Sequence, residues 1–572
     1  MRKLIVIGLC VMAVQACKEN TPAANPVKQE HLARIDSMAA IPQPLQIIDW
    51  YDMARRFDST VYDFKATGEH WPLVWWDSSG RNFPQPVVGL YTAMNDQRQG
   101  THNKGMFHEA LASMGAVLGA TLVGIDKSDQ QGLNYVGMLK NYFNKETGWN
   151  IMMNNTVPEV ALLGGGYGRD WWYDVYPNML FYAIYDKYPN EPGFDTLARS
   201  IADKFYQADS ILDGNYNYSF FNYGTMQPVK NDICEQQDAA AGQAWVLYAA
   251  YRHFGDVRYL EGAKRALKAL EDQPKNTFYE VFMPFGAYLS ARMNAEQGTN
   301  FNARKFLEWT FDGTPECRAG WGVLLGNWNG IDISGIVGST KDRGGYGFLM
   351  NTFDLSWPVV PIARYDAAYA DAVGKWMLNA ANAARFFYTQ YMPDEHETIP
   401  EQAAAGKGVI GYEGIIHSPS YPEYAHLKAP VAQGDGPLWA KGNPAVSQFS
   451  VYGSGHAGFF GSIIRSTNIP AILQLNLLAT DFFHDKAYPT YLYYNPYPEA
   501  KKVIVSLEGK AVDIYNTVSR TFIAKGVGGT YELSVPASSS AILVMVPAGL
   551  KSEIRDGKLV ADNVVIDYHP AK

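Results

Sequence analysis

The sequence predicts a mainly α-helical protein: a closed (α/α)6 toroid of helical hairpins followed by a small antiparallel β-sandwich. Apolar residues recur at helical spacing through residues 45–485, in roughly a dozen segments that come in consecutive pairs. After residue 485 this period is lost, and short β-branched runs broken by Gly, Asn and Pro take its place. The helical pairs follow no fixed short period, which argues against an open solenoid of the tetratricopeptide type. A closed ring of hairpins tolerates unequal loops, and long loops in a compact domain tend to be functional.

The helical segments carry their own start and stop signals. The segment 239–254 is rich in Ala and ends at Gly255, and Asp256 is placed to cap the segment that follows. These segments make up the predicted toroid domain, residues 45–485. We expect helices over residues 47–57, 107–123, 135–143, 173–188, 194–208, 239–254, 257–270, 280–297, 303–309, 366–388 and 468–478.

The C-terminal part, residues 486–572, is predicted to form the β-sandwich. The Pro- and Tyr-rich segment 487–498 is predicted to be an extended connection into it. A turn at Asp556-Gly557 divides the last pair of strands. We expect strands over residues 502–507, 511–515, 521–524, 530–535 and 541–546, and a strand pair over 554–568.

Composition narrows the class of partner. The chain of 572 residues has a net charge of −9, with no run of Lys and Arg, so nucleic acid is not an expected partner. Aromatic residues make up 14% of the chain and charged residues only 18%, a balance that suits a protein handling carbohydrate outside the cytoplasm.

The N-terminus reads as an export signal. Arg2 and Lys3 precede an apolar run too short for a stable membrane anchor, and this run ends in Val-Gln-Ala-Cys17. The ending resembles the lipobox of bacterial lipoproteins. The resemblance implies a signal peptide over residues 1–16, a lipidated Cys17, a tether over 17–44 and a lipid-anchored protein of the cell envelope, at the outer membrane, the cell surface or facing the periplasm. Ordinary secretion with a free Cys17 is the alternative.

The remaining cysteines and histidines predict no metal site. Cys234 and Cys317 would be left after signal cleavage and lipidation, and the sequence leaves open whether they pair. No Cys/His spacing resembles a zinc site, and no nucleotide or flavin fingerprint is present. We expect no cofactor.

The segment GGGYGRDWWYDVYP, residues 164–177, is the richest candidate for a ligand site. Flat rings beside charged groups suit a sugar, which presents apolar faces and hydroxyls. We expect Asp170 to act as a catalytic acid or base. An irregular packed loop is the alternative. The expected substrate-binding residues of the segment are Tyr167, Arg169, Trp171 and Trp172.

Three more carboxylates are catalytic candidates. Glu235 and Asp238 precede the Ala-rich segment 239–254, where the positive end of a helix favours a negative charge. Simple helix capping is the alternative for both. Glu280 lies among aromatic residues, where burial would raise its pKa toward that of a general acid. A structural hydrogen bond explains Glu280 equally well.

Two further loops offer binding groups. The Gly-rich segment 326–346 offers Trp328, Asp332 and Arg343 as binding residues and Tyr346 as a catalytic base. In the segment 99–109, His102 is the expected ligand-binding histidine. We expect Asp170, Glu235 and the region of Trp328 to share one cleft.

The order of signal, helical hairpins and β-rich tail resembles the six-hairpin glycosidases and the related (α/α)-toroid polysaccharide lyases. The strongest local similarity is the segment from Glu235 to Trp245 with the Gly255–Tyr259 stretch behind it. The resemblance implies a glycan-degrading enzyme acting on a polysaccharide or oligosaccharide, with a hydrolase favoured because glycoside cleavage uses two facing carboxyl groups.

Two other functions stay open on the sequence. A uronate-specific lyase would use Tyr346 with Arg343, or Tyr167 with Arg169 and His102, as its base and carboxylate-binding groups. A non-catalytic surface glycan-binding lipoprotein, resembling the helical starch-capture lipoproteins, would bind without turnover. The many acidic candidates and the β-rich tail argue against the second of these.

Overall fold

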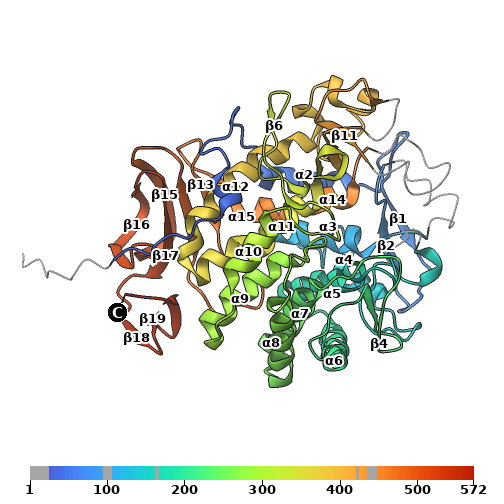
Figure 1. Cartoon of the computed structure of the whole chain (residues 1–572), viewed down its shortest axis with the longest axis horizontal. Coiled ribbons are helices and arrows are strands. Elements are labelled where there is room, and N and C mark those ends of the chain that lie inside the picture. Colours follow the sequence, from blue (N-terminus) through green and yellow to red (C-terminus); the bar gives the residue numbers. More distant parts are fainter. Residues whose placement is uncertain (1–24, 95–105, 162–165, 420–423, 435–447, 572) are drawn as a thin grey trace, which may run out of the picture.

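The computed structural model describes residues 25–94, 106–161, 166–419, 424–434 and 448–571. It confirms a helical domain followed by an antiparallel β-rich region. In Figure 1 the β-rich region lies on the left, whereas the strands that lead toward α3, α7 and α14 lie on the right. These are β2 (Val87–Leu90), β4 (Gln227–Val229) and β11 (Val431–Gln433).

The helical domain contains a closed circuit of contacting helices. Going round it within the described residues, each helix contacts the next, and the α14–α15 pair returns to α3. All of these helices are buried on nearly every side, as expected for an inner layer. The circuit runs through α3 (Ala110–Leu122), α5 (Trp171–Lys187), α7 (Ala239–Phe254), α9 (Met283–Gln297), α11 (Leu349–Tyr365), α14 (Val451–Gly455) and α15 (Gly458–Ile463).

A second layer of amphipathic helices covers the circuit. In α6, Phe194, Leu197 and Ile201 are buried. Asp195, Thr196 and Arg199 are exposed, which gives the one-sided pattern of an outer helix. Each outer helix contacts the inner helix beside it in the chain or in space. They are α2 (Trp50–Val61), α6 (Phe194–Leu212), α8 (Val257–Glu271), α10 (Ala303–Phe311) and α12 (Ala370–Ala383).

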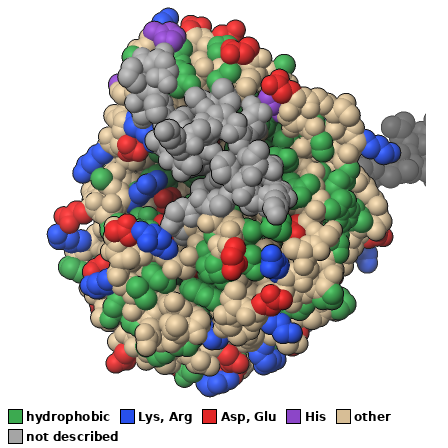
Figure 2. Space-filling view, turned by 90° about the vertical axis from the view of Figure 1, so that its right-hand side faces the viewer, with side chains coloured by type: hydrophobic (Ala, Val, Ile, Leu, Met, Phe, Trp, Pro, Cys, Tyr) green, Lys and Arg blue, Asp and Glu red, His purple; other side chains and the backbone are tan. Residues whose placement is uncertain are grey.

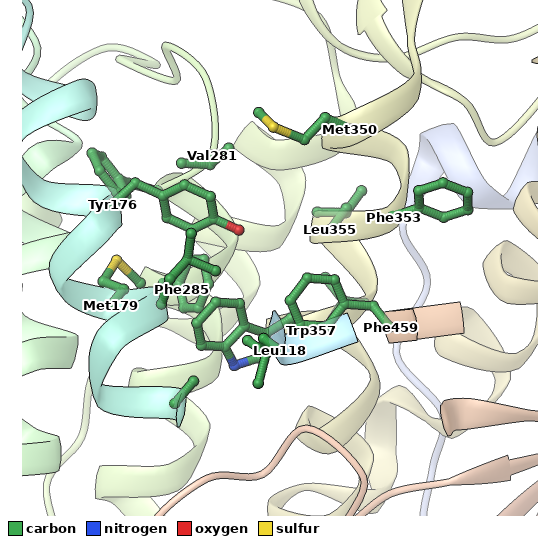
Figure 3. Close-up of a cluster of buried hydrophobic side chains, with 14 of the residues drawn as sticks. Leu118, Tyr176, Met179, Val281, Phe285, Met350, Phe353, Leu355, Trp357 and Phe459 are labelled. Atoms are coloured by element: carbon green, nitrogen blue, oxygen red, sulfur yellow. The ribbon is translucent and has the colours of Figure 1, made fainter. Parts of the chain in front are cut away.

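Trp357 of α11 lies in the core that the circuit surrounds (Figure 3). Its ring stacks on Phe459 of α15 with centroids 5.4 Å apart, and meets Phe285 of α9 edge-on at 5.0 Å and Trp245 of α7 edge-on at 5.2 Å. One side chain therefore contacts three other members of the circuit, and full burial of such a ring is a large hydrophobic contribution.

The circuit is closed where α3 meets α14 and α15. Here the backbones touch: a Cβ atom on Gly119 would collide with the Gly455 carbonyl oxygen, and one on Gly458 with the Gly119 carbonyl. His456 fastens the same seam, since its Nδ1 contacts Asp354 of α11 at 2.5 Å and its Nε2 lies 3.1 Å from the Leu111 carbonyl of α3. The Asp354 carboxylate raises the pKa of His456 against the opposing effect of burial.

Short elements fill the loops between the helices. A two-stranded ladder pairs β1 with β2, another pairs β3 with β4, and β6 pairs with β7. A five-stranded antiparallel sheet has the order β11-β10-β9-β8-β5. The elements not yet given are α1 (Ala33–Asp36), α4 (Tyr135–Met138), β1 (Val74–Asp77), β3 (Phe220–Asn222), β5 (Trp321–Val323), β6 (Asn327–Trp328), β7 (Ile331–Asp332), β8 (Val337–Ser339), β9 (Tyr346–Phe348) and β10 (Gly414–Ile416).

The β-rich region is a six-stranded antiparallel sheet of order β12-β13-β14-β17-β15-β16 with a three-stranded sheet, β18-β19-β20, beside it. Tyr515 and Val544 of the first sheet and Ile566 of the second belong to one buried cluster. The strands are β12 (Ile464–Ser466), β13 (Leu473–Asn476), β14 (Thr490–Asn495), β15 (Lys501–Asn516), β16 (Thr521–Val535), β17 (Ser539–Pro547), β18 (Ser552–Arg555), β19 (Lys558–Ala561) and β20 (Val564–Asp567).

Two sequence predictions need correction, and one helix was not predicted. The expected helix 468–478 is wrong: its residues supply β13, which pairs with β12 and β14. The expected connection 487–498 contains β14, whose six residues pair with β17. Helix α11 was missed because Pro358 and Pro361 lie inside it. The expected helix 366–388 is confirmed: α12 and the 3-10 turns that flank it cover residues 367–387.

The N-terminal segment is also more ordered than a tether. The Val27 amide donates to the Val518 carbonyl at 2.8 Å, and the Glu30 amide to the Ala368 carbonyl at 2.7 Å. Leu32, Ile35 and Met38 are buried in the main core. From residue 25 onward, the predicted tether therefore lies against the helical domain and the β-rich region.

The open question about the cysteines is answered: Cys234 and Cys317 form a disulfide, with Cα atoms 5.9 Å apart. Among the described residues, no helix combines the length and the apolar character that crossing a bilayer requires. Within the same ranges, no group of three His, Cys, Asp or Glu side chains is arranged to hold a metal ion.

Candidate active site

Carboxylates gather at the N-terminal ends of consecutive inner helices. Asp170 is the N-cap residue of α5 and Asp238 that of α7, and Glu280 lies three residues before α9. Neither aspartate side chain bonds to an amide of its own helix, so capping does not explain them. Both aspartate side chains instead accept a hydrogen bond from Tyr279, Asp238 from its backbone amide and Asp170 from its hydroxyl.

Asp170 is a nearly buried carboxyl group with two donors. Its Oδ1 accepts a hydrogen bond from Gln236 Nε2 at 2.5 Å and its Oδ2 one from the Tyr279 hydroxyl at 3.2 Å. Only 6% of the residue is exposed. Burial raises the pKa of Asp170 to about 7 and the negative charge of Glu280 adds to this, against the lowering effect of the Gln236 hydrogen bond.

Glu280, unlike Asp170, is paired directly with a positively charged side chain. Arg318 Nη2 lies 3.2 Å from its Oε1, and Asn351 Nδ2 donates to its Oε2 at 3.2 Å. The Glu280 backbone carbonyl is held by Trp321 Nε1 at 3.0 Å and by Asn351 Nδ2 at 2.9 Å. A guanidinium and an amide donor both favour an ionised carboxylate, so Asp170 and Glu280 are biased toward different protonation states.

Asp238 is completely buried and holds in place the segment that carries Tyr279 and Glu280. Its Oδ2 accepts the Tyr279 backbone amide at 3.0 Å, which fixes the residue that bonds Asp170 and precedes Glu280. Burial is the main cause that raises the pKa of Asp238 to about 8, and the charge of Glu280 contributes. Because no solvent reaches it, Asp238 is a positioning residue in this arrangement.

Two tyrosines complete the cluster. Tyr173, on the first turn of α5, lies within electrostatic reach of Glu109, Asp170 and Glu280, and its ring packs against Trp172 with centroids 4.0 Å apart. Burial and these negative charges hold the pKa of Tyr173 well above its usual value, and the same causes raise that of Tyr279. Both hydroxyls therefore stay protonated, and that of Tyr279 donates its hydrogen bond to Asp170.

Not all residues predicted from the 164–177 segment lie in this cluster. Trp171 is fully buried: it stacks on Tyr216 with centroids 5.6 Å apart and donates to the Tyr223 hydroxyl, which makes it a core residue. Trp172 is 6% exposed. Tyr167 donates to Asn144 Oδ1 at 2.6 Å, and Arg169 forms an ion pair with Asp232.

Glu235 is separated from the other carboxylates although Gln236 follows it. Its side chain is 37% exposed and pairs with Lys230, which is itself more than half exposed. Glu235 thus forms an ion pair at the protein surface. Glu280, not Glu235, is the carboxylate whose charge acts on Asp170. That Asp170, Glu235 and the region of Trp328 share one cleft stays a prediction.

The residues predicted in the segment 326–346 form their own cluster on β6 to β9. Trp328 contacts the His417 ring edge-on at 5.5 Å, and Asp332 accepts the Ser334 amide at 3.0 Å. The Arg343 guanidinium lies over the Tyr346 ring, 5.0 Å from its centre, and Tyr346 is 5% exposed. His102 lies outside the described residues, as does Cys17.

Sequence reasoning missed Gln236, Tyr279, Arg318 and Asn351. The first two are neighbours of predicted carboxylates, and Arg318 follows Cys317 directly. The disulfide gives a reason for that position, since it links the segment carrying Gln236 to the segment carrying Arg318. Adjacency to a candidate acid, or to a cysteine, was the only signal available.

Figure 2 faces the end of the molecule that lies on the right in Figure 1. On its described surface, acidic and basic side chains are interspersed without one large patch of a single sign. A surface of this kind does not attract a polyanion by long-range electrostatics, so recognition would depend on local contacts.

No family model matches the chain, and no curated protein is similar to it. Among solved structures, it is similar to a GH127 β-L-arabinofuranosidase from Geobacillus stearothermophilus T6, with 12% identity over 91% of this chain and 86% of that one and a TM-score of 0.32. A second GH127 β-arabinofuranosidase shows 9% identity over 92% and 84%, at 0.34. A third, described as a glycoside hydrolase, shows 10% identity over 81% and 77%, at 0.35. These similarities are too remote to assign an activity.

Proposed function

We propose that this protein is a glycoside hydrolase acting on a polysaccharide or oligosaccharide, with Asp170 as the proton donor and Glu280 as the ionised carboxylate. The observation that carries the proposal is the contrast between the two groups. Asp170 has a pKa of about 7 and holds its proton, while Glu280 is paired with Arg318. Glycoside cleavage uses such a pair, one carboxyl group protonated and the other charged.

The two carboxyl groups divide the reaction between them. Asp170 donates its proton to the departing glycosidic oxygen as the bond breaks, so the leaving group departs as a neutral alcohol. Glu280 stabilises the positive charge that develops on the sugar ring, either by attacking the anomeric carbon or by taking a proton from the attacking water. Water is consumed, and one new hydroxyl group forms on each side of the cleaved bond.

The tyrosines argue for a hydrolase over a uronate lyase. A lyase needs a side chain that removes a proton beside a carboxylate, and burial raises the pKa of Tyr173 and Tyr279 well above the usual value. Tyr346 with Arg343 is the pair left for that chemistry. A purely binding protein gains nothing from nearly buried carboxylates, which cost free energy to keep out of water.

We also propose that the circuit of inner helices is the inner ring of an (α/α)6 toroid. The support is that each inner helix contacts the next and that α14 and α15 return to α3, with amphipathic helices outside. In such a ring the N-terminal ends of the inner helices meet at one rim, where Asp170, Asp238 and Glu280 lie.

The test is incubation of purified protein with soluble plant, algal and host glycans, followed by mass analysis of the products. Hydrolysis yields products that together are heavier than the substrate by one water per cleavage. Asp170→Asn and Glu280→Gln should abolish them, with Glu235→Ala as the matched control. Products that absorb in the ultraviolet and carry no added water would establish elimination, and binding without any product would establish a glycan-binding protein.

The envelope location is a separate proposal, supported by the lipobox-like ending at Cys17. We expect the full chain expressed in a Gram-negative host to incorporate an alkyne-tagged fatty acid and to sediment with membranes. Cys17→Ala should lose both properties and be released as soluble protein, whereas Cys10→Ala should behave as the parent. Release of the parent chain without label would mean ordinary secretion.

A further inference from the structure

The β-rich region contains a crevice of about 620 Å³ that the proposed reaction does not use. It is lined by residues of β12, β13, β14, β15 and β17. In Figure 1 these strands lie at the left, whereas β4, the strand that precedes Asp238 and α7 in the chain, lies at the right. The volume falls within the range of small-molecule binding sites.

Aromatic rings form one side of the crevice. Tyr491 and Tyr493 are two residues apart on β14, so their side chains lie on the same face of the sheet. Tyr493 is buried and is held by a hydrogen bond from Gln474 of β13, whereas Tyr491 is partly exposed. Tyr491 thus presents a ring to the crevice, and Tyr493 and Gln474 keep its surroundings rigid.

Polar groups form the rim. The register of β15 against β16 jumps between Leu507 and Val512, so that residues 508–511 bulge out of the ladder. The bulge carries Glu508 and Lys510 to the crevice, and a bulge often serves to re-aim side chains at a site. Glu508 is close enough to Tyr491 to raise the pKa of its hydroxyl, after burial as the main cause.

We propose that this crevice binds a short stretch of neutral glycan. A half-exposed ring beside hydroxyl, amide and carboxylate groups matches a sugar, which stacks an apolar face while its hydroxyls form hydrogen bonds. The residues that line the crevice include one acid, Glu508, and one base, Lys510, so the lining carries no net charge, which disfavours a polyanion. Because none of the residues that line the crevice belongs to the cluster around Asp170, the crevice would hold a polymeric substrate rather than cleave it.

The test is native affinity electrophoresis of the Asp170→Asn protein, so that nothing is degraded. The gels contain arabinoxylan, β-glucan, arabinogalactan or starch, with polygalacturonate as the anionic comparison. We expect at least one neutral polysaccharide to retard the protein. Tyr491→Ala should weaken that retardation at least about five-fold, and Tyr491→Phe, which keeps the ring, should leave it nearly unchanged.

A second variant covers the case in which Tyr491→Ala loses stability. Ser506 is exposed and lines the crevice, so Ser506→Trp should block it without removing a core contact. Loss of retardation with an unchanged melting temperature supports the proposal. Absence of retardation by every neutral polysaccharide, or retardation unaffected by both Tyr491→Ala and Ser506→Trp, overturns it. Since the assay requires no turnover, a failed hydrolase proposal would leave this result intact.

Discussion

Cys234 and Cys317 join the two segments that tune the candidate acid and its partner. Gln236, two residues after the first cysteine, donates to Asp170, and Arg318, one residue after the second, pairs with Glu280. The disulfide spans 83 residues of sequence. The disulfide therefore fixes the position of Gln236, which bonds Asp170, relative to Arg318, whose guanidinium pairs with the Glu280 carboxylate.

Loss of this disulfide should lower activity more than its effect on stability explains. We expect Cys234→Ser with Cys317→Ser to lower the free energy of unfolding by about 2–4 kcal/mol. At a temperature where the variant stays folded, kcat should fall about ten- to a hundred-fold, because misplacing a catalytic group by an ångström is costly. Parallel kcat and melting measurements, with dithiothreitol treatment of the parent, check this. An unchanged kcat in the folded variant would remove the positioning role.

Asp170 should set the alkaline limit of activity. The proposed mechanism requires the proton of Asp170, whose pKa is about 7, so kcat/KM should fall as the pH rises above about 7. Asp170→Asn should lower kcat about 10²- to 10⁴-fold and abolish this dependence. A pH profile of the parent whose alkaline limb lies far above 7 would assign the proton donor elsewhere.

The same residue should make stability depend on pH. In the unfolded chain Asp170 ionises near 3.8, whereas the folded protein keeps the proton to about 7. The stability that this proton provides is full below the lower value and is lost as the pH rises through the higher one. Relative to the parent, Asp170→Asn should thus gain unfolding free energy between pH 4 and 7, by about 2–4 kcal/mol at most. Urea titrations across that range measure it.

Asp238 should tolerate amidation but not truncation. With a pKa of about 8 it is mostly neutral at pH 7, and Asn preserves an acceptor for the Tyr279 amide. We expect Asp238→Asn to keep kcat within a few-fold. Asp238→Ala should lose about 1–3 kcal/mol of stability, because the buried amide is left unpaired. Equal losses of activity in both variants would instead give Asp238 a direct part in the chemistry.

Glu235 should be dispensable. Its carboxylate is partly exposed and pairs with an exposed lysine, and such pairs contribute about 0–1 kcal/mol. Glu235→Ala should change kcat by less than about two-fold and stability by about 0.5 kcal/mol or less. A large fall in kcat in steady-state assays would return it to the active site.

Replacing a glycine by alanine where α3 meets α14 and α15 should destabilise the protein. At Gly119 an added Cβ meets the Gly455 carbonyl, so Gly119→Ala should cost about 1–3 kcal/mol or more. Gly528→Ala is the matched control, because its Cβ would find only one ordinary contact, 3.9 Å from Ala511. Differential scanning calorimetry should show a lower melting temperature for the first variant and little change for the second.

Local patterns predicted most helices of both layers but failed where tertiary contacts decide. Pro358 and Pro361 hid α11, which is stable because Trp357 is buried among its neighbours. The strand β14 was hidden by the prolines around it, although a central position in a sheet favours its apolar residues. Hydrophobic periodicity cannot tell which of two strands or helices a segment will pack against.

The acidic residues show a similar limit. Asp170, Asp238 and Glu280 were predicted from their residue type and their neighbours, and the structure brings them together. Their different roles depend on burial and on Arg318, which no local pattern reveals. Trp171 and Glu235 looked equivalent to these residues in the sequence, but one faces the core and the other faces solvent.

The contact between α3 and the α14–α15 pair has a consequence for biosynthesis. In the sequence, α3 and the α14–α15 pair are separated by most of the helical domain. In the fold they are joined by the contacts of Gly119 with Gly455 and Gly458 and by the bond of His456 to Leu111. A ribosome-bound chain that stops before residue 451 already contains Asp170 and Glu280. It lacks α14 and α15, the helices that contact α3 and close the circuit. We expect such a nascent chain to be catalytically silent, so that competence arrives only after α14 and α15 have been translated.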